Sequence, residues 1–371
     1  MQAPDVATLT QQVLWVAFFI AVAFGAVAQR THFCTMGAVA DVVHLGDWTR
    51  ARMWAGAIGT AMLGFAALAG GGWIDPAASF YTTPRLLWLS HVLGGLMFGF
   101  GMVLGSGCGS KTLVRLGGGN LKSLVVFLVL GLSAYMTLRG VTAVLRVATV
   151  DQVAWQLPVG QDLPALLAGP DAALRRQWAG GLGAALGLAL WAWVLARREG
   201  RSADVLLGAL GVGGAVAAMW WASGVLGYLP EHPRTLEPAY LASNSRTLES
   251  LSFVAPVAYT LDWLMLFSDR SNLISLGVVS TAGVVLGSAA AALAGRRFRW
   301  EGFAGVDDLA QHLVGATLMG VGGVTAVGCT IGQGLSGVST LSLGSFIALA
   351  AILAGAVLAL RYQVWRLERS E

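Results

Sequence analysis

Three cysteines, Cys34, Cys108 and Cys329, are the residues of this chain with the most distinctive chemistry. A thiol is a weak S–H donor and a soft partner for another sulfur atom, whereas a thiolate would bind a soft metal or attack a sulfur centre. The odd count and the lack of a C-x-x-C pair argue against a disulfide framework. We therefore expect the thiols to act on a substrate.

Two of these cysteines belong to a repeated pattern. His91 precedes Cys108 by 17 positions, and His312 precedes Cys329 by the same 17. At the resulting offset of 221, four glycine pairs coincide: Gly94 with Gly315, Gly99 with Gly320, Gly101 with Gly322 and Gly107 with Gly328. The sequence thus predicts two copies of one unit, in each of which an apolar helix leads into a Gly-Cys pair.

The residues around the Gly-Cys pairs favour an anionic substrate. Free backbone N–H groups at a helix start attract anions, and glycine lets a ligand approach the main chain. A lysine within a membrane is costly unless it faces water or an anion. We therefore predict a substrate pathway of Cys34, Cys108, Cys329, Gly107, Gly109, Lys111, Gly328, Thr330 and Gln333, with Arg30, Arg115, Lys122, Gly332 and Ser336 as secondary candidates.

Simpler interpretations compete for several of these residues. The G-x-x-x-G spacing of Gly101, Gly105 and Gly109 is typical of close helix packing in membranes. Lys122 and Arg115 are also placed to extend toward a membrane surface. His91 and His312 each lie about 25 Å along a helix from their own cysteine. For both histidines we expect a position at the membrane interface.

The sequence around Cys108 also resembles a phosphate-binding P-loop, but the match is incomplete. Gly105 to Thr112 differs from the P-loop pattern only at Ser110, where the pattern requires glycine. The run follows an apolar span, whereas a P-loop follows a strand. The sequence therefore argues against a nucleotide site.

Composition predicts a membrane protein. Of the 371 residues, 56% are hydrophobic and 11% charged, against about 25% charged in soluble domains. The net charge of +4 is scattered over short loops, which argues against nucleic-acid binding. Apolar segments long enough to cross a bilayer predict nine spans, near 12–29, 51–70, 86–107, 121–140, 178–196, 204–223, 272–294, 309–328 and 341–361. Shorter apolar segments predict re-entrant half-helices near 33–45, 109–118, 251–267 and 330–340.

The fold that we expect is an all-α polytopic membrane protein with a single transmembrane domain over residues 1–371. Positive loops favour the cytoplasmic side. Nine crossings place four arginine clusters on that side if the N-terminus is outside and the C-terminus cytoplasmic. The repeats, near 12–140 and 204–361 with an extra helix near 178–196, then run in opposite directions around a pseudo-two-fold axis. Inverted repeats of this kind are a common transporter plan, with the substrate site at the repeat interface.

Three segments resemble the YeeE/YedE family of membrane sulfur-compound transporters: Arg30–Gly37, Gly105–Arg115 with Gly117–Lys122, and Gly328–Gly337. The resemblance implies a protein of the bacterial inner membrane with nine spanning helices and several half-helices. It also implies that Cys34, Cys108 and Cys329 pass thiosulfate along one path through S–H contacts with its terminal sulfur. A small cytoplasmic sulfur-carrier protein often accompanies such transporters.

The leading hypothesis is therefore a transporter that imports thiosulfate or a related small sulfur anion, with no enzymatic activity, cofactor or resident metal. The residues alone do not choose among thiosulfate, sulfite, sulfide and selenium species. Three alternatives stay open: a membrane sulfurtransferase or redox protein with a persulfidated cysteine, a selenium-compound transporter, and a channel for soft metals.

Overall fold

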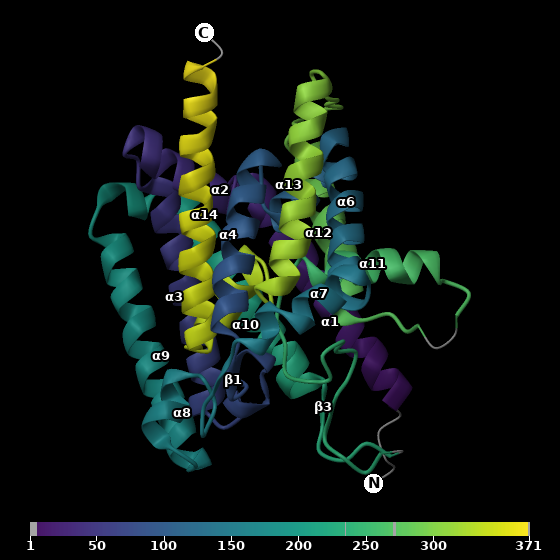
Figure 1. Ribbon diagram of the computed structural model, residues 1–371. Coiled ribbons are helices and arrows are strands. Elements are labelled where there is room, and N and C mark those ends of the chain that lie inside the picture. The colour runs from purple at the N-terminus through teal and green to yellow at the C-terminus, as the bar shows by residue number, and fades with distance from the viewer. Residues whose placement is uncertain (1–5, 234, 270–271, 370–371) are drawn as a thin grey trace.

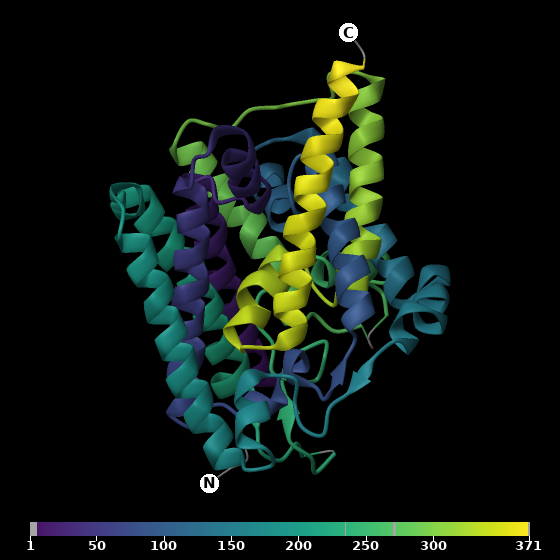
Figure 2. The same ribbon diagram turned by 60° about the vertical axis from the view of Figure 1, so that its left-hand side comes forward.

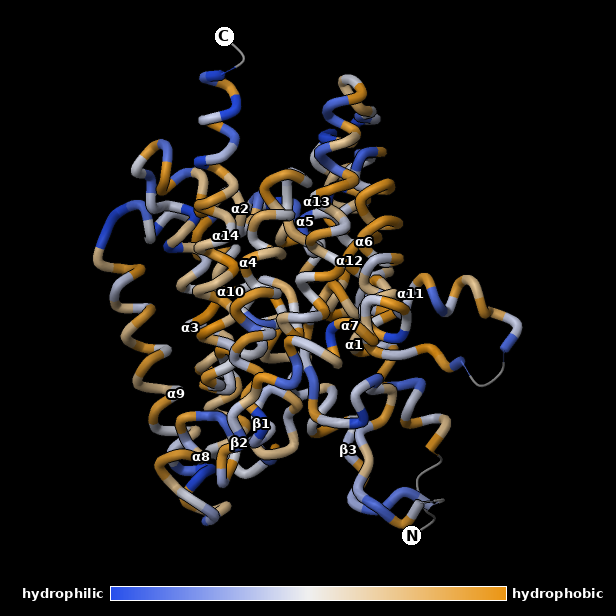
Figure 3. Tube along the Cα trace, viewed as in Figure 1, coloured by the Kyte–Doolittle hydropathy of each residue, from blue (hydrophilic) through white to orange (hydrophobic). Residues whose placement is uncertain are grey.

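Long apolar helices form most of the molecule, of which the computed structural model describes residues 6–233, 235–269 and 272–369. Each of the nine predicted spans coincides with one of them. They are α1 (Val6–Arg30), α3 (Thr49–Gly70), α4 (Trp88–Leu104), α6 (Leu121–Arg139), α9 (Ala172–Leu195), α10 (Ala203–Trp221), α12 (Leu276–Ala294), α13 (Val306–Thr325) and α14 (Leu343–Glu368). Hydrophobic residues dominate the middle of the helices, and hydrophilic residues gather toward both ends (Figure 3). The prediction of an all-α polytopic membrane protein is confirmed.

The helix α13 differs from the other eight. Within the described ranges, eight helical segments are long and apolar enough to cross a membrane, and α13 is not among them. It has 20 residues, but its first two turns carry Asp307, Asp308 and His312. These polar residues, together with its glycines, lower the mean hydropathy of a helix that packs mainly against protein.

Short helices occupy all four segments predicted as half-spanning. They are α2 (Thr35–Ala40) with the π-helix η1 (Asp41–Leu45), α5 (Gly109–Gly117), α11 (Ala255–Met265) and the π-helix η7 (Gly332–Gly337). The remaining short helices are η2 (Pro76–Ala78), η3 (Phe80–Thr82), α7 (Val141–Ala148), η4 (Val150–Gln152), α8 (Leu163–Ala168), η5 (Arg198–Arg201) and the π-helix η6 (Ala222–Leu226). Two antiparallel strand pairs, β1 (Arg85–Leu86) with β2 (Trp155–Gln156) and β3 (Tyr228–Leu229) with β4 (Ala239–Tyr240), lie toward the end of the molecule where the chain begins (Figure 1).

Helix packing follows the same rule in both halves of the chain. The helix α4 packs against α14, and α13, its counterpart in the second copy, packs against α6. Likewise, α1 packs against α12, and its counterpart α10 packs against α3. The helices α4 and α13 pack against each other, and Figure 1 shows α4 between α13 and α14. Glycines allow this approach, since a methyl group on Gly94 would lie 2.3 Å from Ala326 N and one on Gly315 would lie 2.5 Å from Gly105 N.

The two Gly-Cys loops have the same backbone conformation. Ser106 and Gly107 have φ angles of 57° and 158°, and Val327 and Gly328 have φ angles of 61° and 157°. The following long helix begins at Leu121 in one half and at Leu343 in the other, an offset of 222 rather than 221. The π-helix η7 accommodates the extra residue, as π-bulges do elsewhere. These matches support our proposal of two inverted repeats within one membrane domain.

The ends of the molecule differ in charge. The α9–α10 connection, the α12–α13 connection and the C-terminal end of α14 all lie at the end opposite to the N-terminus (Figures 1 and 2). Three basic clusters therefore lie at this end: Arg197 with Arg198 and Arg201; Arg296 with Arg297 and Arg299; and Arg361 with Arg366 and Arg369. The orientation of this end toward the cytoplasm stays a prediction.

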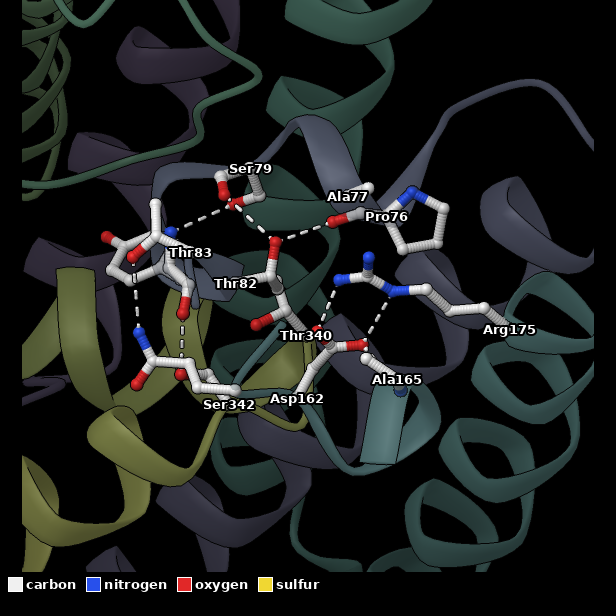
Figure 4. Close-up of polar contacts among 12 residues, drawn as sticks. Pro76, Ala77, Ser79, Thr82, Thr83, Asp162, Ala165, Arg175, Thr340 and Ser342 are labelled. Atoms are coloured by element: carbon white, nitrogen blue, oxygen red, sulfur yellow. Dashed lines mark hydrogen bonds and ion pairs between the residues drawn. The ribbon is translucent and has the colours of Figure 1, made fainter. Parts of the chain in front are cut away.

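A buried ion pair ties the opposite end together (Figure 4). Arg175 forms two hydrogen bonds with the fully buried carboxylate of Asp162, one of them from Nε at 3.1 Å. Asp162 also caps α8 through Ala165 N at 3.1 Å. The neighbouring residue Leu163 donates its backbone N–H to Leu341 O, just beyond η7. The pair thus fixes the loop before α8 against the residues that follow η7.

Replacing Arg175 by alanine is expected to destabilise the protein by about 3–5 kcal/mol, because the Asp162 carboxylate would stay buried without its partner. Thermal unfolding of the purified protein in detergent measures the change. Arg176→Ala is the matched control, since the neighbouring Arg176 is exposed. Equal unfolding temperatures for the two variants would show that the ion pair does not hold the loops.

Candidate functional site

All three cysteines are buried at the start of a short helix. Cys34 is the N-cap residue of α2 and Cys108 is the N-cap residue of α5. Cys329 directly precedes the helical residues that lead into η7. Their exposed fractions are 8%, 1% and 0%. The three motifs that are far apart in the sequence therefore place their sulfur atoms in equivalent local settings.

Cys34 and Cys108 lie on either side of one threonine. Thr35, the neighbour of Cys34, has its Oγ1 atom 4.0 Å from Cys108 Sγ. Cys34 Sγ accepts the backbone N–H of Gly37 at 3.4 Å, and Cys108 Sγ lies 3.3 Å from Ser110 Oγ. The structure therefore brings these two thiols into one neighbourhood.

Phe253 connects the Cys108 loop to Cys329. Its backbone N–H donates to Cys329 Sγ at 3.3 Å. On the other side, a methyl group on Gly109 would lie 3.1 Å from Phe253 O, so the start of α5 contacts the residue that binds Cys329. Cys108 is connected to Cys34 through Thr35, and to Cys329 through Gly109 and Phe253. The sulfur atoms thus form a series in which Cys108 is central.

Besides Phe253, Ser252 is a contact of Cys329 that the sequence prediction missed. Gly332, a secondary candidate, donates its N–H to Cys329 Sγ at 3.4 Å, and Ser252 Oγ lies 3.9 Å from the same sulfur. Ser252 and Phe253 immediately precede α11, within a segment predicted only as re-entrant. The signal that could have found them is the correspondence of Phe33 with Phe253, each two residues before a half-helix.

Lys111 is a basic residue in the first turn of α5, three residues after Cys108. It lies on α5 within electrostatic range of Cys34 and Cys108, and it makes no ion pair with a carboxylate in the described part of the chain. Gly107 accommodates its side chain, since a methyl group there would lie 3.0 Å from Lys111 Cγ. An uncompensated ammonium beside two buried thiols fits an anionic ligand.

Further basic groups surround Cys34. Arg297 Nη1 lies 3.2 Å from His32 Nε2, and a methyl group on Gly37 would lie 2.5 Å from Arg50 Nη1. Arg50 pairs with Asp41 at 3.2 Å. We call His32, Arg50, Lys111, Arg115 and Arg297 the inner basic cluster. The four lysine and arginine side chains of this cluster give the surroundings of Cys34 a positive potential, which Asp41 partly offsets.

The remaining candidates divide into two groups. Gln333 and Ser336 lie near Cys329, where Gln333 Nε2 donates to Ala326 O at 2.7 Å and Ser336 Oγ donates to Leu251 O at 2.7 Å. Thr330 Oγ1 is buried without a hydrogen-bond partner among the described residues. By contrast, Lys122 pairs with Asp308 at 2.7 Å, and Arg30 is exposed at the end of α1.

His91 makes a contact that the sequence did not predict, whereas its position at the membrane interface stays a prediction. Its side chain is 5% exposed, and its Nδ1 lies 3.1 Å from Ala326 O, at the start of the second Gly-Cys loop. The prediction measured the distance along one helix to Cys108. Because α4 crosses α13, the first turn of α4 instead contacts the loop of the other copy.

A cavity of about 290 Å³ borders Gly328 and Ser252, two neighbours of Cys329. Gly328, Ser252, Arg146, Glu249 and Tyr259 are among its lining residues. Arg146 pairs with Asp151 at 2.9 Å. Burial raises the pKa of Glu249 above its ordinary value, so this carboxyl opposes an anion less than an exposed glutamate would.

Comparisons with known proteins agree with this arrangement. A sequence profile of the sulphur transport family matches residues 30–358, a range that contains all three cysteines. The chain is also 27% identical over 349 residues to a protein of Spirochaeta thermophila named thiosulfate transporter TsuA. That alignment covers 90% of this chain and 94% of the relative. The resemblance inferred from the cysteine motifs is confirmed, and the chain belongs to the sulphur transport family of multi-pass membrane proteins.

Proposed function

We propose that this protein imports thiosulfate, or a closely related sulfur anion, across the bacterial inner membrane through a pathway lined by its three cysteines. The carrying observation is the series of buried thiols, linked through Phe253 and Thr35, with the unpaired Lys111 beside two of them. The N-terminus would face outside and the C-terminus the cytoplasm. The substrate would enter through the cavity at Gly328 and leave past the inner basic cluster.

The chemistry of the pathway suits an anion that carries a soft sulfur atom. The starts of α5 and α11 meet where Gly109 contacts Phe253, so two helix N-termini contribute positive potential at the centre. Each thiol can donate S–H to the terminal sulfur of thiosulfate, a contact between two polarizable atoms. In the order Cys329, Cys108, Cys34, such contacts would replace the hydration of that sulfur step by step.

The contacts of the thiols favour passage of intact substrate over a sulfurtransferase. The groups within hydrogen-bond range of the three sulfur atoms are backbone N–H groups and hydroxyls, and no basic side chain is among them in the described residues. A persulfide mechanism needs an activated thiolate. A small cytoplasmic sulfur-carrier protein would receive the product at the inner basic cluster.

Uptake by vesicles tests this proposal. Liposomes that contain the purified protein should accumulate labelled thiosulfate down its concentration gradient, faster than liposomes without protein. Unlabelled sulfite, sulfate and selenite, added separately as competitors, rank the selectivity, and we expect sulfate to compete least because it lacks a soft sulfur atom. Uptake no faster than in protein-free liposomes would contradict the proposed function.

A further inference from the structure

Tyr81 carries a buried polar group without a partner. Its side chain is 3% exposed, and its hydroxyl has no hydrogen-bond partner among the described residues. Most buried hydroxyls in proteins are hydrogen-bonded, so an unpaired one indicates a missing ligand or water. The position of the hydroxyl decides between these explanations.

The hydroxyl lies beside Cys329. A methyl group on Gly332 would lie 3.2 Å from Tyr81 Oη and 2.7 Å from Ser252 Oγ, so both hydroxyls approach the same glycine. That glycine donates its N–H to Cys329 Sγ at 3.4 Å, and Ser252 Oγ lies 3.9 Å from the sulfur. Two hydroxyls therefore converge on Gly332, whose N–H group contacts the Cys329 thiol, and only glycine allows this approach.

Packing holds Tyr81 in this position. Its ring lies 3.9 Å from the ring of Phe80 and 6.3 Å from that of Trp220, between centroids. Ser342 Oγ donates to Tyr81 O at 2.7 Å. The next residue, Thr82, donates its Oγ1 to Pro76 O at 2.7 Å and to Ser79 O at 2.9 Å (Figure 4). A donor fixed in this way binds a ligand without a further ordering cost.

We propose that Tyr81, together with Ser252, determines substrate specificity at Cys329 by donating O–H hydrogen bonds to the oxygen atoms of the sulfur oxyanion. This inference rests on the proposed function. The terminal sulfur of thiosulfate would contact the Cys329 thiol while its oxygen atoms face the two hydroxyls. The site thereby recognises both ends of the anion, one soft and one hard.

A competing role for the hydroxyl is contact with buried water. Tyr81 also borders a cavity of about 40 Å³, as do Gln333 and Ser345, whose side-chain oxygens likewise have no partner among the described residues. A cavity of this size has room for a water molecule. If water alone served the Tyr81 hydroxyl, its removal would leave thiosulfate transport unchanged.

The test measures thiosulfate uptake into liposomes as a function of concentration. Tyr81→Phe keeps the ring and its packing, and it should raise the half-saturation concentration about tenfold, the effect of losing one hydrogen bond to a charged group. The maximal rate should stay within about twofold of wild type. Ser252→Ala should act in the same direction, and Gly332→Ala should block uptake because its methyl group would displace both hydroxyls. Tyr240→Phe, on the outer hairpin, is the matched control and should match wild type.

An unchanged half-saturation concentration in both Tyr81→Phe and Ser252→Ala would overturn the inference. So would a fall in the maximal rate alone, because that result indicates a structural role. If Cys329→Ala is inactive while Tyr81→Phe matches wild type, the proposed function stands and only this inference fails. Absence of uptake by the wild-type protein would overturn both.

Discussion

Replacing Cys329 by alanine is expected to abolish thiosulfate uptake, with a fall of at least a hundredfold. The thiol is fully buried next to Gly328, which lines the cavity, and in the proposed pathway it is the first thiol that the substrate meets. Alanine removes the S–H donor and leaves the N–H groups of Phe253 and Gly332 without their acceptor. The initial rate of uptake into liposomes measures the effect.

A control separates the loss of sulfur from the loss of packing. Val338→Ala shortens a residue that is 2% exposed, near the end of the same short helical segment. It creates a comparable cavity without touching a thiol, and we expect it to retain most of the uptake. Full activity of Cys329→Ala, or equal losses in both variants, would remove Cys329 from the transport mechanism.

Replacing Lys111 by glutamine is expected to reduce uptake by roughly 10- to 100-fold, the effect of losing a hydrogen-bonded charge next to the anion. The same change should not destabilise the protein. Lys111 has no carboxylate partner among the described residues, so glutamine removes the cost of keeping an ammonium group largely out of water. A rate assay and thermal unfolding of the same preparations measure both effects.

The second lysine of the chain supplies the control. Lys122 pairs with Asp308 and lies outside the cysteine series, so Lys122→Gln should leave uptake within about twofold of wild type. The two variants remove the same charge from the same protein. If both reduced uptake equally, the effect would arise from the net charge of the molecule, and Lys111 would lose its role at the site.

The sequence was sufficient for the helices and half-helices because their signals are local. Apolar runs of membrane length predicted all nine long helices, and four shorter runs predicted the half-helices. The Gly-Cys spacing predicted two helices that break in the same way, and Ser106 and Val327 have the same left-handed conformation. Each of these features depends on residues that are neighbours along the chain.

The sequence failed where contacts join distant segments. The sequence placed His91 only relative to Cys108 on its own helix, so it missed the contact with Ala326 in the other copy. Tyr81 and Ser252 have no motif around them, and only the crossing of the two halves brings them to Gly332. Arg50 and Arg297 likewise approach Cys34 through folding, while Arg30, its near neighbour in the sequence, is exposed.

Thiosulfate with separate labels on its two sulfur atoms provides the most direct test of the central claim, which is passage of the intact anion. Liposomes that contain the wild-type protein are incubated with this substrate, and the sulfur labels inside and outside are then counted. The proposed pathway predicts that both labels enter in a one-to-one ratio and that no sulfite is released outside. Entry of the terminal sulfur alone, with sulfite left outside, would contradict it and establish sulfur transfer through a persulfidated cysteine.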